Sequence, residues 1–308
     1  MRHPATFEVL AGSVKFKLGS CTRGPVSLHK PMDPKTFIEQ LLFSTVRIEA
    51  DKDEGVEAAT AFIFEYPLND KSTPFLVTNN HVVKGAKVGR FFFTKSDGQK
   101  PQVGNRFDVE IQSFEQQWHP HPRDSIDVAV MPLGPLLNEI ANRGVQVFIR
   151  ALPKRFIPTP QQVADLDALE EIVFVGYPSG IYDVKNLMPI IRRGTTATPL
   201  QIDYEGEPAF LVDASVFPGS SGSPVLISNQ GGYPTKSGFV VGSRILLLGV
   251  IARVFYTESE GKIEIMAVPT GIKPILKTQQ MIDLGIVYKA NTIIEAVENF
   301  LTKVGVSK

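Results

Sequence analysis

One serine in a glycine-rich loop is the residue of this sequence best suited to nucleophilic chemistry. Residues 217–225 are FPGSSGSPV, so that Ser221 is followed by Gly222, then by Ser-Pro-Val and further apolar residues. This composition predicts a tight loop that leads into a buried strand. In such a loop the Ser221 hydroxyl would be a nucleophile. The N–H groups of Gly219 and Ser221 would form an oxyanion hole for a carbonyl oxygen.

A nucleophilic serine requires a base, and the sequence has a candidate far upstream. His81 follows a short apolar run at residues 75–77, and Asp127 stands at the start of an alternating strand pattern at residues 128–131. In the serine-protease mechanism the hydroxyl attacks, an imidazole takes its proton, and a buried carboxylate orients the imidazole. His81, Asp127 and Ser221 are therefore the predicted catalytic residues.

Three short blocks carry a family resemblance. Residues 78–83, 124–131 and 219–225 are TNNHVV, DSIDVAVM and GSSGSPV. They resemble the active-site blocks of trypsin-like serine proteases and are most similar to the bacterial branch with the HtrA-type and glutamyl-endopeptidase enzymes. The resemblance covers residues 41–276 and implies an all-β, chymotrypsin-like fold of two antiparallel six-stranded β-barrels. It leaves no room for the PDZ domain that follows the protease domain in HtrA enzymes.

The resemblance also implies a specificity pocket. In the family, the residue six positions before the nucleophile forms the pocket floor, which is Ser215 here, and Val216, Ala252 and Val254 would line the walls. No negative charge is present to attract Lys or Arg. We therefore expect a preference for small or medium apolar side chains at P1, the substrate residue before the cleaved bond. Arg253 lies close enough to leave a preference for acidic residues open.

The position before the nucleophile departs from the trypsin-type pattern. Zymogens of that type carry an aspartate there, which binds a freed N-terminus, whereas this sequence has Ser220. Activation through that ion pair is therefore not expected. Ordering of the loop by substrate, by a regulatory partner or by a homo-oligomer is the alternative, and residues 1–32 are a candidate for this role.

Other residues compete for the catalytic roles. Asp124 follows an arginine in a polar turn and is expected to be solvated, whereas Asp127 adjoins the apolar strand. Ser220 and Ser223 are the neighbouring hydroxyls. The side chain of Ser220 is expected to turn away from the substrate, and Ser223 occupies a position where relatives carry Gly or Ser.

A metal site is a weaker hypothesis. His119 and His121 lie in WHPHP at residues 118–122, close to Asp124. The prolines favour an extended loop and no cysteine accompanies the histidines, so surface loop residues are the favoured interpretation. Neither a metal nor another cofactor is expected, and Cys21 is interpreted as an inert thiol.

Composition limits the partners and the location. The chain of 308 residues carries 32 basic and 32 acidic residues, so neither nucleic acid nor an anionic membrane is an expected partner. Its one cysteine excludes an intramolecular disulfide and suits a reducing compartment. The longest apolar stretch, residues 238–255, is interrupted by Arg244 and Arg253, and no apolar signal-peptide core is evident. These features favour a cytoplasmic location.

The strand and turn patterns divide the chain into five parts. A helix is expected from Asp33 as N-cap, and another after a capping box formed by Thr292 and Glu295. The expected parts are an N-terminal extension with a short helix (1–40), the first barrel (41–135), an inter-barrel linker (136–169), the second barrel (170–276) and a C-terminal extension with a helix (277–308).

The sequence thus predicts a serine endopeptidase that cleaves proteins or peptides through an acyl-enzyme. Two alternatives remain open. One is a protease fold with an idle triad that serves as a binding or scaffolding module. The other is an effector protease dedicated to one cognate protein.

Overall fold

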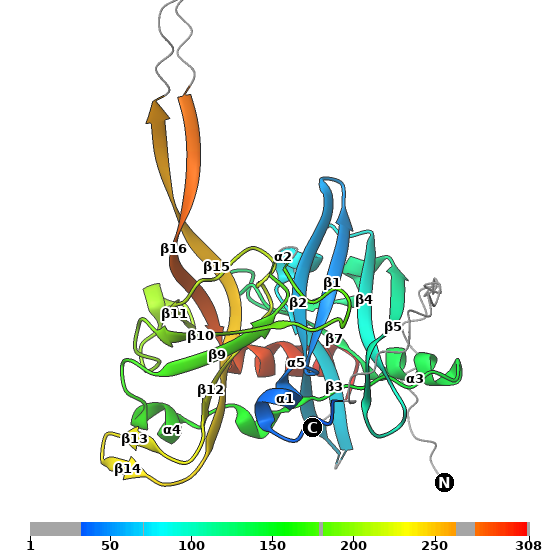
Figure 1. Ribbon diagram of the computed structural model, residues 1–308, viewed down its shortest axis with the longest axis horizontal. Helices are drawn as coiled ribbons and strands as arrows, with labels where there is room; N and C mark the ends of the chain where they lie inside the picture. The colour runs from blue at the N-terminus through cyan, green and yellow to red at the C-terminus, as the bar shows by residue number, and fades with distance from the viewer. Residues whose placement is uncertain (1–31, 70, 179–180, 263–274, 307–308) are drawn as a thin grey trace, which may run out of the picture.

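Strands dominate the molecule and form two lobes that lie side by side (Figure 1). The N-terminal 31 residues, which include Cys21, lie outside the described residues. The computed structural model describes residues 32–69, 71–178, 181–262 and 275–306, with side chains left out for 256–262 and 275–281.

The first lobe is one eight-stranded sheet. Its strands follow the order β5-β4-β1-β2-β3-β7-β6, and β8 adds to β2 in parallel. The other pairs are antiparallel. The strands are β1 (Thr45–Lys52), β2 (Gly55–Leu68), β3 (Lys71–Thr78), β4 (Val88–Ser96), β5 (Pro101–Gln112), β6 (His119–Pro120), β7 (Ala129–Pro132) and β8 (Leu152–Pro153).

The second lobe is a closed six-stranded antiparallel barrel. Its order is β10-β11-β16-β15-β12-β9, and a separate hairpin of β13 and β14 lies beside it. The all-β, chymotrypsin-like fold class is thereby confirmed, although the first lobe has eight strands in a sheet. The strands are β9 (Glu171–Gly176), β10 (Ile190–Thr196), β11 (Ala209–Asp213), β12 (Pro224–Asn229), β13 (Tyr233–Thr235), β14 (Gly238–Val240), β15 (Arg244–Lys262) and β16 (Ile275–Lys289).

Strand β16 belongs to the second lobe along its inner half. Residues from Leu284 to Tyr288 pair with β11, and Lys289 pairs with Gly249 of β15. The barrel therefore continues to Lys289, beyond residue 276 where the sequence placed its end. The outer halves of β15 and β16 continue as a two-stranded ribbon that projects from the body (Figure 1).

Short helices connect the strands, and two of them begin differently from the sequence prediction. The first helix, α1, is capped by Thr36 in a capping box with Glu39, not by Asp33. The last helix, α5, has Ala290 as N-cap, and Thr292 donates to the Lys289 carbonyl instead of capping. The helices are α1 (Phe37–Leu41), α2 (Asn80–Val83), α3 (Gly134–Asn142), α4 (Pro160–Asp165) and α5 (Asn291–Lys303), with 3-10 turns at Phe114–Gln117, Lys154–Phe156 and Tyr204–Gly206.

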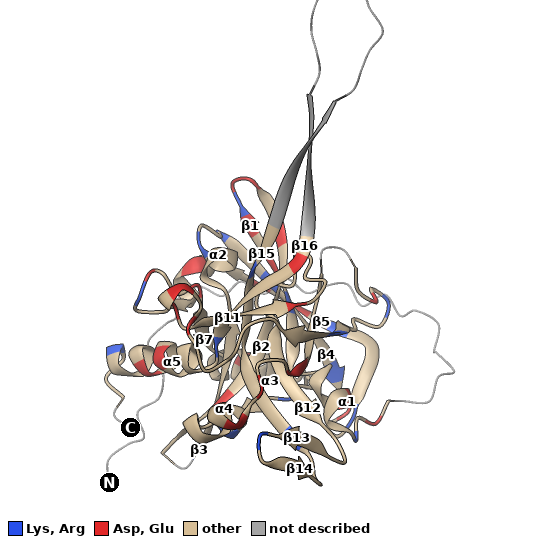
Figure 2. Cartoon of the chain, turned by 90° about the vertical axis from the view of Figure 1, so that its left-hand side faces the viewer, with Lys and Arg blue, Asp and Glu red and all other residues tan. Residues whose placement is uncertain are grey.

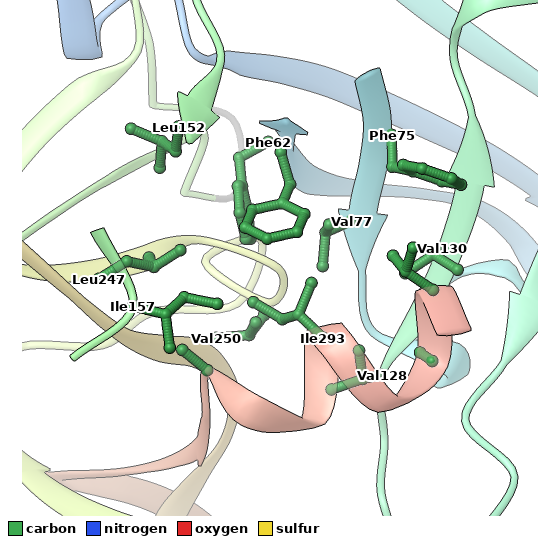
Figure 3. Packing of buried hydrophobic residues seen from close by; sticks show 14 of the residues in the cluster. Phe62, Phe75, Val77, Val128, Val130, Leu152, Ile157, Leu247, Val250 and Ile293 are labelled. Carbon is green, nitrogen blue, oxygen red and sulfur yellow. The ribbon is translucent and has the colours of Figure 1, made fainter. Parts of the chain in front are cut away.

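A shared hydrophobic core joins the two lobes and α5. Phe62 and Phe75 come from the first lobe, Val250 from the second, and Ile293 from α5, and all four are fully buried (Figure 3). The Phe75 and Phe300 rings meet edge to face with centroids 5.9 Å apart. Helix α5 therefore docks beneath both lobes and fixes their relative position.

Charge is spread over the surface without a dominant sign. Figure 2 shows acidic and basic residues interspersed along the described part of the chain, in line with the zero net charge. No helix among the described residues is long and apolar enough to cross a bilayer.

Candidate active site

Neighbouring strands bring His81 and Asp127 together. His81 lies in α2, directly after β3, and Asp127 lies two residues before β7, which pairs with β3 from Thr78 to Phe75. Asp127 Oδ2 lies 2.5 Å from His81 Nδ1, and its Oδ1 accepts the His81 backbone N–H at 2.8 Å. Both carboxylate oxygens of Asp127 are thus committed to one residue.

The Asp127 carboxylate is buried, yet it stays ionised. Burial by itself raises its pKa, but the hydrogen bonds and charge of His81 outweigh that effect and leave the pKa below its ordinary value. An ionised carboxylate accepts the Nδ1 proton of His81, so Nε2 of the neutral ring is the atom that accepts a proton. Because folding lowers the pKa, this contact stabilises the fold above the acid range and is lost as the pH falls.

Three further hydrogen bonds hold this part of the site. Asn79 Nδ2 donates to the Asp127 carbonyl at 2.7 Å. Lys52 Nζ donates to the His81 carbonyl at 2.7 Å and to Glu57 Oε2 at 2.6 Å. Lys52 and Glu57 lie in the hairpin of β1 and β2, which therefore supports the backbone of His81.

The Ser221 loop leaves two amides free. Gly219 and Gly222 have φ values of 85° and 83°, which only glycine adopts without strain. The Ser220 N–H donates to the Phe217 carbonyl at 3.0 Å. Among the described residues, the N–H groups of Gly219 and Ser221 have no acceptor. The loop therefore presents two donors of the kind that bind an oxyanion.

Thr60 of β2 ties this loop to the first lobe. Its N–H donates to the Ser221 carbonyl at 3.0 Å, and its hydroxyl donates to the Gly219 carbonyl, also at 3.0 Å. The same hydroxyl accepts the Tyr177 N–H at 2.9 Å. Two contacts of buried Thr60 thus hold the loop against the first lobe, and the third ties the same hydroxyl to Tyr177.

Gly222 is the tightest point of this contact. A Cβ there would lie 1.9 Å from the Thr60 carbonyl oxygen, whereas a Cβ at Gly206, which has a similar φ of 76°, would meet nothing within 4 Å. We expect Gly206→Ala to cost about 1–2 kcal/mol of unfolding free energy for its left-handed backbone. Gly222→Ala should cost a further ~1–3 kcal/mol from overpacking. Urea unfolding measures both, and equal losses would contradict the clash.

A cleft of about 840 Å³ runs between the two lobes and contains the predicted catalytic residues. The Ser221 hydroxyl has no hydrogen-bond partner within the described part of the chain. In unliganded enzymes the hydrogen bond from a nucleophilic serine to its histidine base often forms fully only when substrate binds. Residues that line the cleft include His81, Asp127 and Asp124 from the first lobe and Gly219, Ser221, Val216, Ala252, Arg253 and Val254 from the second.

The predicted specificity residues divide into two groups. Val216, Ala252 and Val254 line the cleft. Ser215 is not among the lining residues, and its carbonyl accepts a hydrogen bond from Arg192. Arg192 was not predicted as a site residue, because a strand arginine gives no local signal of what it contacts.

The competing residues have other environments. Asp124 is exposed at the cleft, as expected, while Ser223 is fully buried and its hydroxyl has no hydrogen-bond partner among the residues that the structure describes. The prediction of a surface position is wrong for His121, whose ring is fully buried with Nε2 3.0 Å from Glu295 Oε2. Glu295 therefore bonds a histidine rather than completing a capping box. No cluster of three or more metal-ligand residues occurs within the described ranges.

Comparison with known families decides the assignment. The sequence model of the trypsin-like peptidase domain matches residues 59–232, more than half of the chain. The chain belongs to this family. The matched region of this trypsin-like peptidase includes His81, Asp127 and Ser221, and family membership supports a peptidase that acts on proteins or peptides.

Solved structures of proteases resemble this trypsin-like peptidase at low sequence identity. The Rv3671c protease of M. tuberculosis in its active form is 17% identical over 95% of this chain and 96% of that chain, with a TM-score of 0.42. The HtrA-type protease AlgW with tripeptide is 14% identical over 87% of this chain, with a TM-score of 0.46, and this chain covers 63% of its length. A comparison with curated protein sequences finds no match.

Proposed function

We propose that this trypsin-like peptidase is a serine endopeptidase that cleaves peptide bonds through His81, Asp127 and Ser221. One observation carries the proposal. The carboxylate of Asp127 holds Nδ1 of His81 at 2.5 Å in the same cleft that contains Ser221, whose own N–H and that of Gly219 have no acceptor among the described residues. An oriented base, a hydroxyl and an oxyanion site are the parts that acyl transfer requires.

The reaction follows from these positions. Ser221 Oγ attacks the peptide carbonyl carbon while His81 Nε2 takes the hydroxyl proton. The N–H groups of Gly219 and Ser221 bind the resulting oxyanion, each donor contributing about 10²–10³ in rate. When the C–N bond breaks, His81 gives the proton to the leaving amine. Water then attacks the Ser221 ester while His81 takes a proton from that water. His81 returns the proton to Ser221 Oγ as the acid product leaves, which restores the hydroxyl.

Apolar cleft walls and one cation supply the substrate preference. Val216, Ala252 and Val254 favour small or medium apolar P1 side chains. Arg253 is exposed in the cleft without an ion pair among the described residues. Burial, the largest effect, raises the pKa of Asp127, whereas His81 and, to a smaller extent, the charge of Arg253 lower it. We therefore propose that Arg253 favours an acidic residue beside P1.

Cleavage of a peptide library varied at P1 to P4 measures this preference. Arg253→Gln should reduce the selection of acidic residues up to about fivefold, since an exposed ion pair contributes at most about 1 kcal/mol. Lys84→Gln, which removes a cation from the other side of the cleft, is the matched control and should leave the selection unchanged. A strong P1 preference for Lys or Arg would contradict the proposed pocket.

Covalent labelling tests the function itself. The purified protein is incubated with a fluorophosphonate probe, digested, and the modified peptide is located by mass spectrometry. We expect the label on Ser221, because only an activated serine reacts. An unlabelled protein would instead support an idle, protease-like scaffold. Labelling without casein cleavage would support a protease dedicated to one cognate protein.

A further inference from the structure

Arg192 of β10 reaches beneath the Ser221 loop. One guanidinium nitrogen, Nη1, donates to the Ser215 carbonyl, and the other, Nη2, donates to the hydroxyl of Ser220. Ser215 stands at the start of the loop, and Ser220 directly precedes the proposed nucleophile. One side chain therefore joins both ends of residues 215–221.

Two aromatic rings hold the guanidinium in place. Its central carbon lies 4.6 Å from the centroid of Phe174 and 5.6 Å from that of Phe217. Burial lowers the pKa of Arg192 to about 10, which leaves the group charged at neutral pH. Planar stacking together with two directed N–H bonds is a combination that lysine does not reproduce.

This cation has no carboxylate partner in the described part of the chain. Its Nε is buried without a hydrogen-bond partner, and its two polar contacts are to a neutral carbonyl and a neutral hydroxyl. A half-buried charge with so few contacts costs free energy. Both of its polar contacts lie on the loop that carries the two free amides.

Ser220 is the residue between Gly219 and Ser221, whose N–H groups form the proposed oxyanion hole. Fixing its side chain fixes the peptide plane between Ser220 and Ser221, which carries the Ser221 N–H. The Gly219 N–H lies on the plane before Gly219, within the loop whose start is anchored by the contact to the Ser215 carbonyl. Arg192 is absent from the residues that line the cleft, so it acts through the loop and not on the substrate. We propose that Arg192 is a positioning residue that holds residues 215–221 with both amides open to the oxyanion. This inference rests on the proposed serine-endopeptidase function.

The test replaces the donors and retains the bulk. Arg192→Met keeps a long side chain between the rings but cannot donate a hydrogen bond. Arg192→Lys keeps the charge but lacks the two guanidinium N–H donors that point in fixed directions. Arg193→Met is the matched control, since Arg193 is the neighbouring arginine, is exposed, and forms one ion pair within the described residues, with Glu171 at 3.7 Å. The readouts are the rate of fluorophosphonate labelling at Ser221, kcat and KM for p-nitrophenyl acetate, and the Tm.

Loss of the oriented amides should appear in kcat and in labelling. We expect Arg192→Met to lower kcat and the labelling rate by about 10²–10³, the value of one oxyanion donor, while KM changes less than about threefold because ground-state binding is not affected. Arg192→Lys should recover part of the loss, and Arg193→Met should match the wild type. A purely structural role would lower the Tm without separating kcat from KM.

Ser220→Ala removes the hydroxyl that accepts the hydrogen bond from Arg192. This variant tests the inference if Arg192→Met does not fold. It should reproduce part of the kcat loss, and the double variant should lose less than the sum of the two effects, since one interaction is removed twice. Wild-type kcat in folded Arg192→Met, or in Ser220→Ala when Arg192→Met is unfolded, would overturn the inference. Failure of the wild type to label at all would instead overturn the proposed function.

Discussion

Ser221→Ala is expected to lower kcat for peptide cleavage by about 10⁶-fold and to abolish fluorophosphonate labelling. The alanine removes the nucleophile but leaves the Gly219 and Ser221 amides and the cleft intact. The residual rate should therefore still exceed that of the uncatalysed reaction, because the oxyanion site continues to act on a water-mediated attack. So large a decrease in kcat is measured by following peptide cleavage over hours and quantifying the product by chromatography.

Ser223→Ala is the matched control for this loss. Its hydroxyl is fully buried and has no hydrogen-bond partner in the described ranges, so removing it takes away a buried unsatisfied group without touching the cleft. We expect labelling and kcat to stay at wild-type values. If Ser223→Ala abolished labelling while Ser221→Ala retained it, the nucleophile would have been misassigned.

Asp127→Asn is expected to lower kcat by about 10⁴-fold while the fold persists. The backbone N–H of His81 donates to Asp127 Oδ1 at 2.8 Å, so the carboxamide must keep its oxygen there. Its NH₂ group then faces His81 Nδ1, which forces the ring proton onto Nε2. With Nε2 protonated, the imidazole cannot take the proton of Ser221. Steady-state kinetics at neutral pH, with circular dichroism to verify folding, tests this expectation.

Asp124→Asn provides the comparison for that variant. Asp124 lies at the same cleft but is exposed and makes no bond to the imidazole. Its removal changes the net charge by the same amount and should alter kcat by less than about threefold, as for other exposed charges. Equal losses in the two variants would mean that the charge of the cleft, and not the orientation of His81, governs the rate.

Much of the fold could be predicted because the strands follow local patterns. In β5, Phe107, Val109 and Ile111 alternate with more exposed residues and face the first-lobe core, and this period of two is visible in the sequence. The start of α4 also follows a local pattern, because Thr159 and Gln162 have the spacing of a capping box and form one. The predicted box at Thr292 is wrong, because the helix begins earlier with Ala290 as N-cap, which places Thr292 inside the helix, and Glu295 contacts buried His121 instead.

The supporting contacts of the site could not be predicted from local pattern. Thr60 and Arg192 lie on strands far from Ser221 in the sequence, and their types are ordinary for strands. Their importance comes from which loop passes over them in three dimensions. The candidate catalytic residues were recognisable because their chemistry demands particular types in particular local settings, whereas the residues that position them have no such signature.

The core that α5 shares with both lobes has a consequence for how the molecule loses its structure. Separating the lobes would expose Phe62, Val250 and Ile293 to water together, so neither lobe has an independent melting transition. Heat or denaturant is thus expected to dismantle the cleft in a single cooperative step, and its geometry persists as long as the whole protein does.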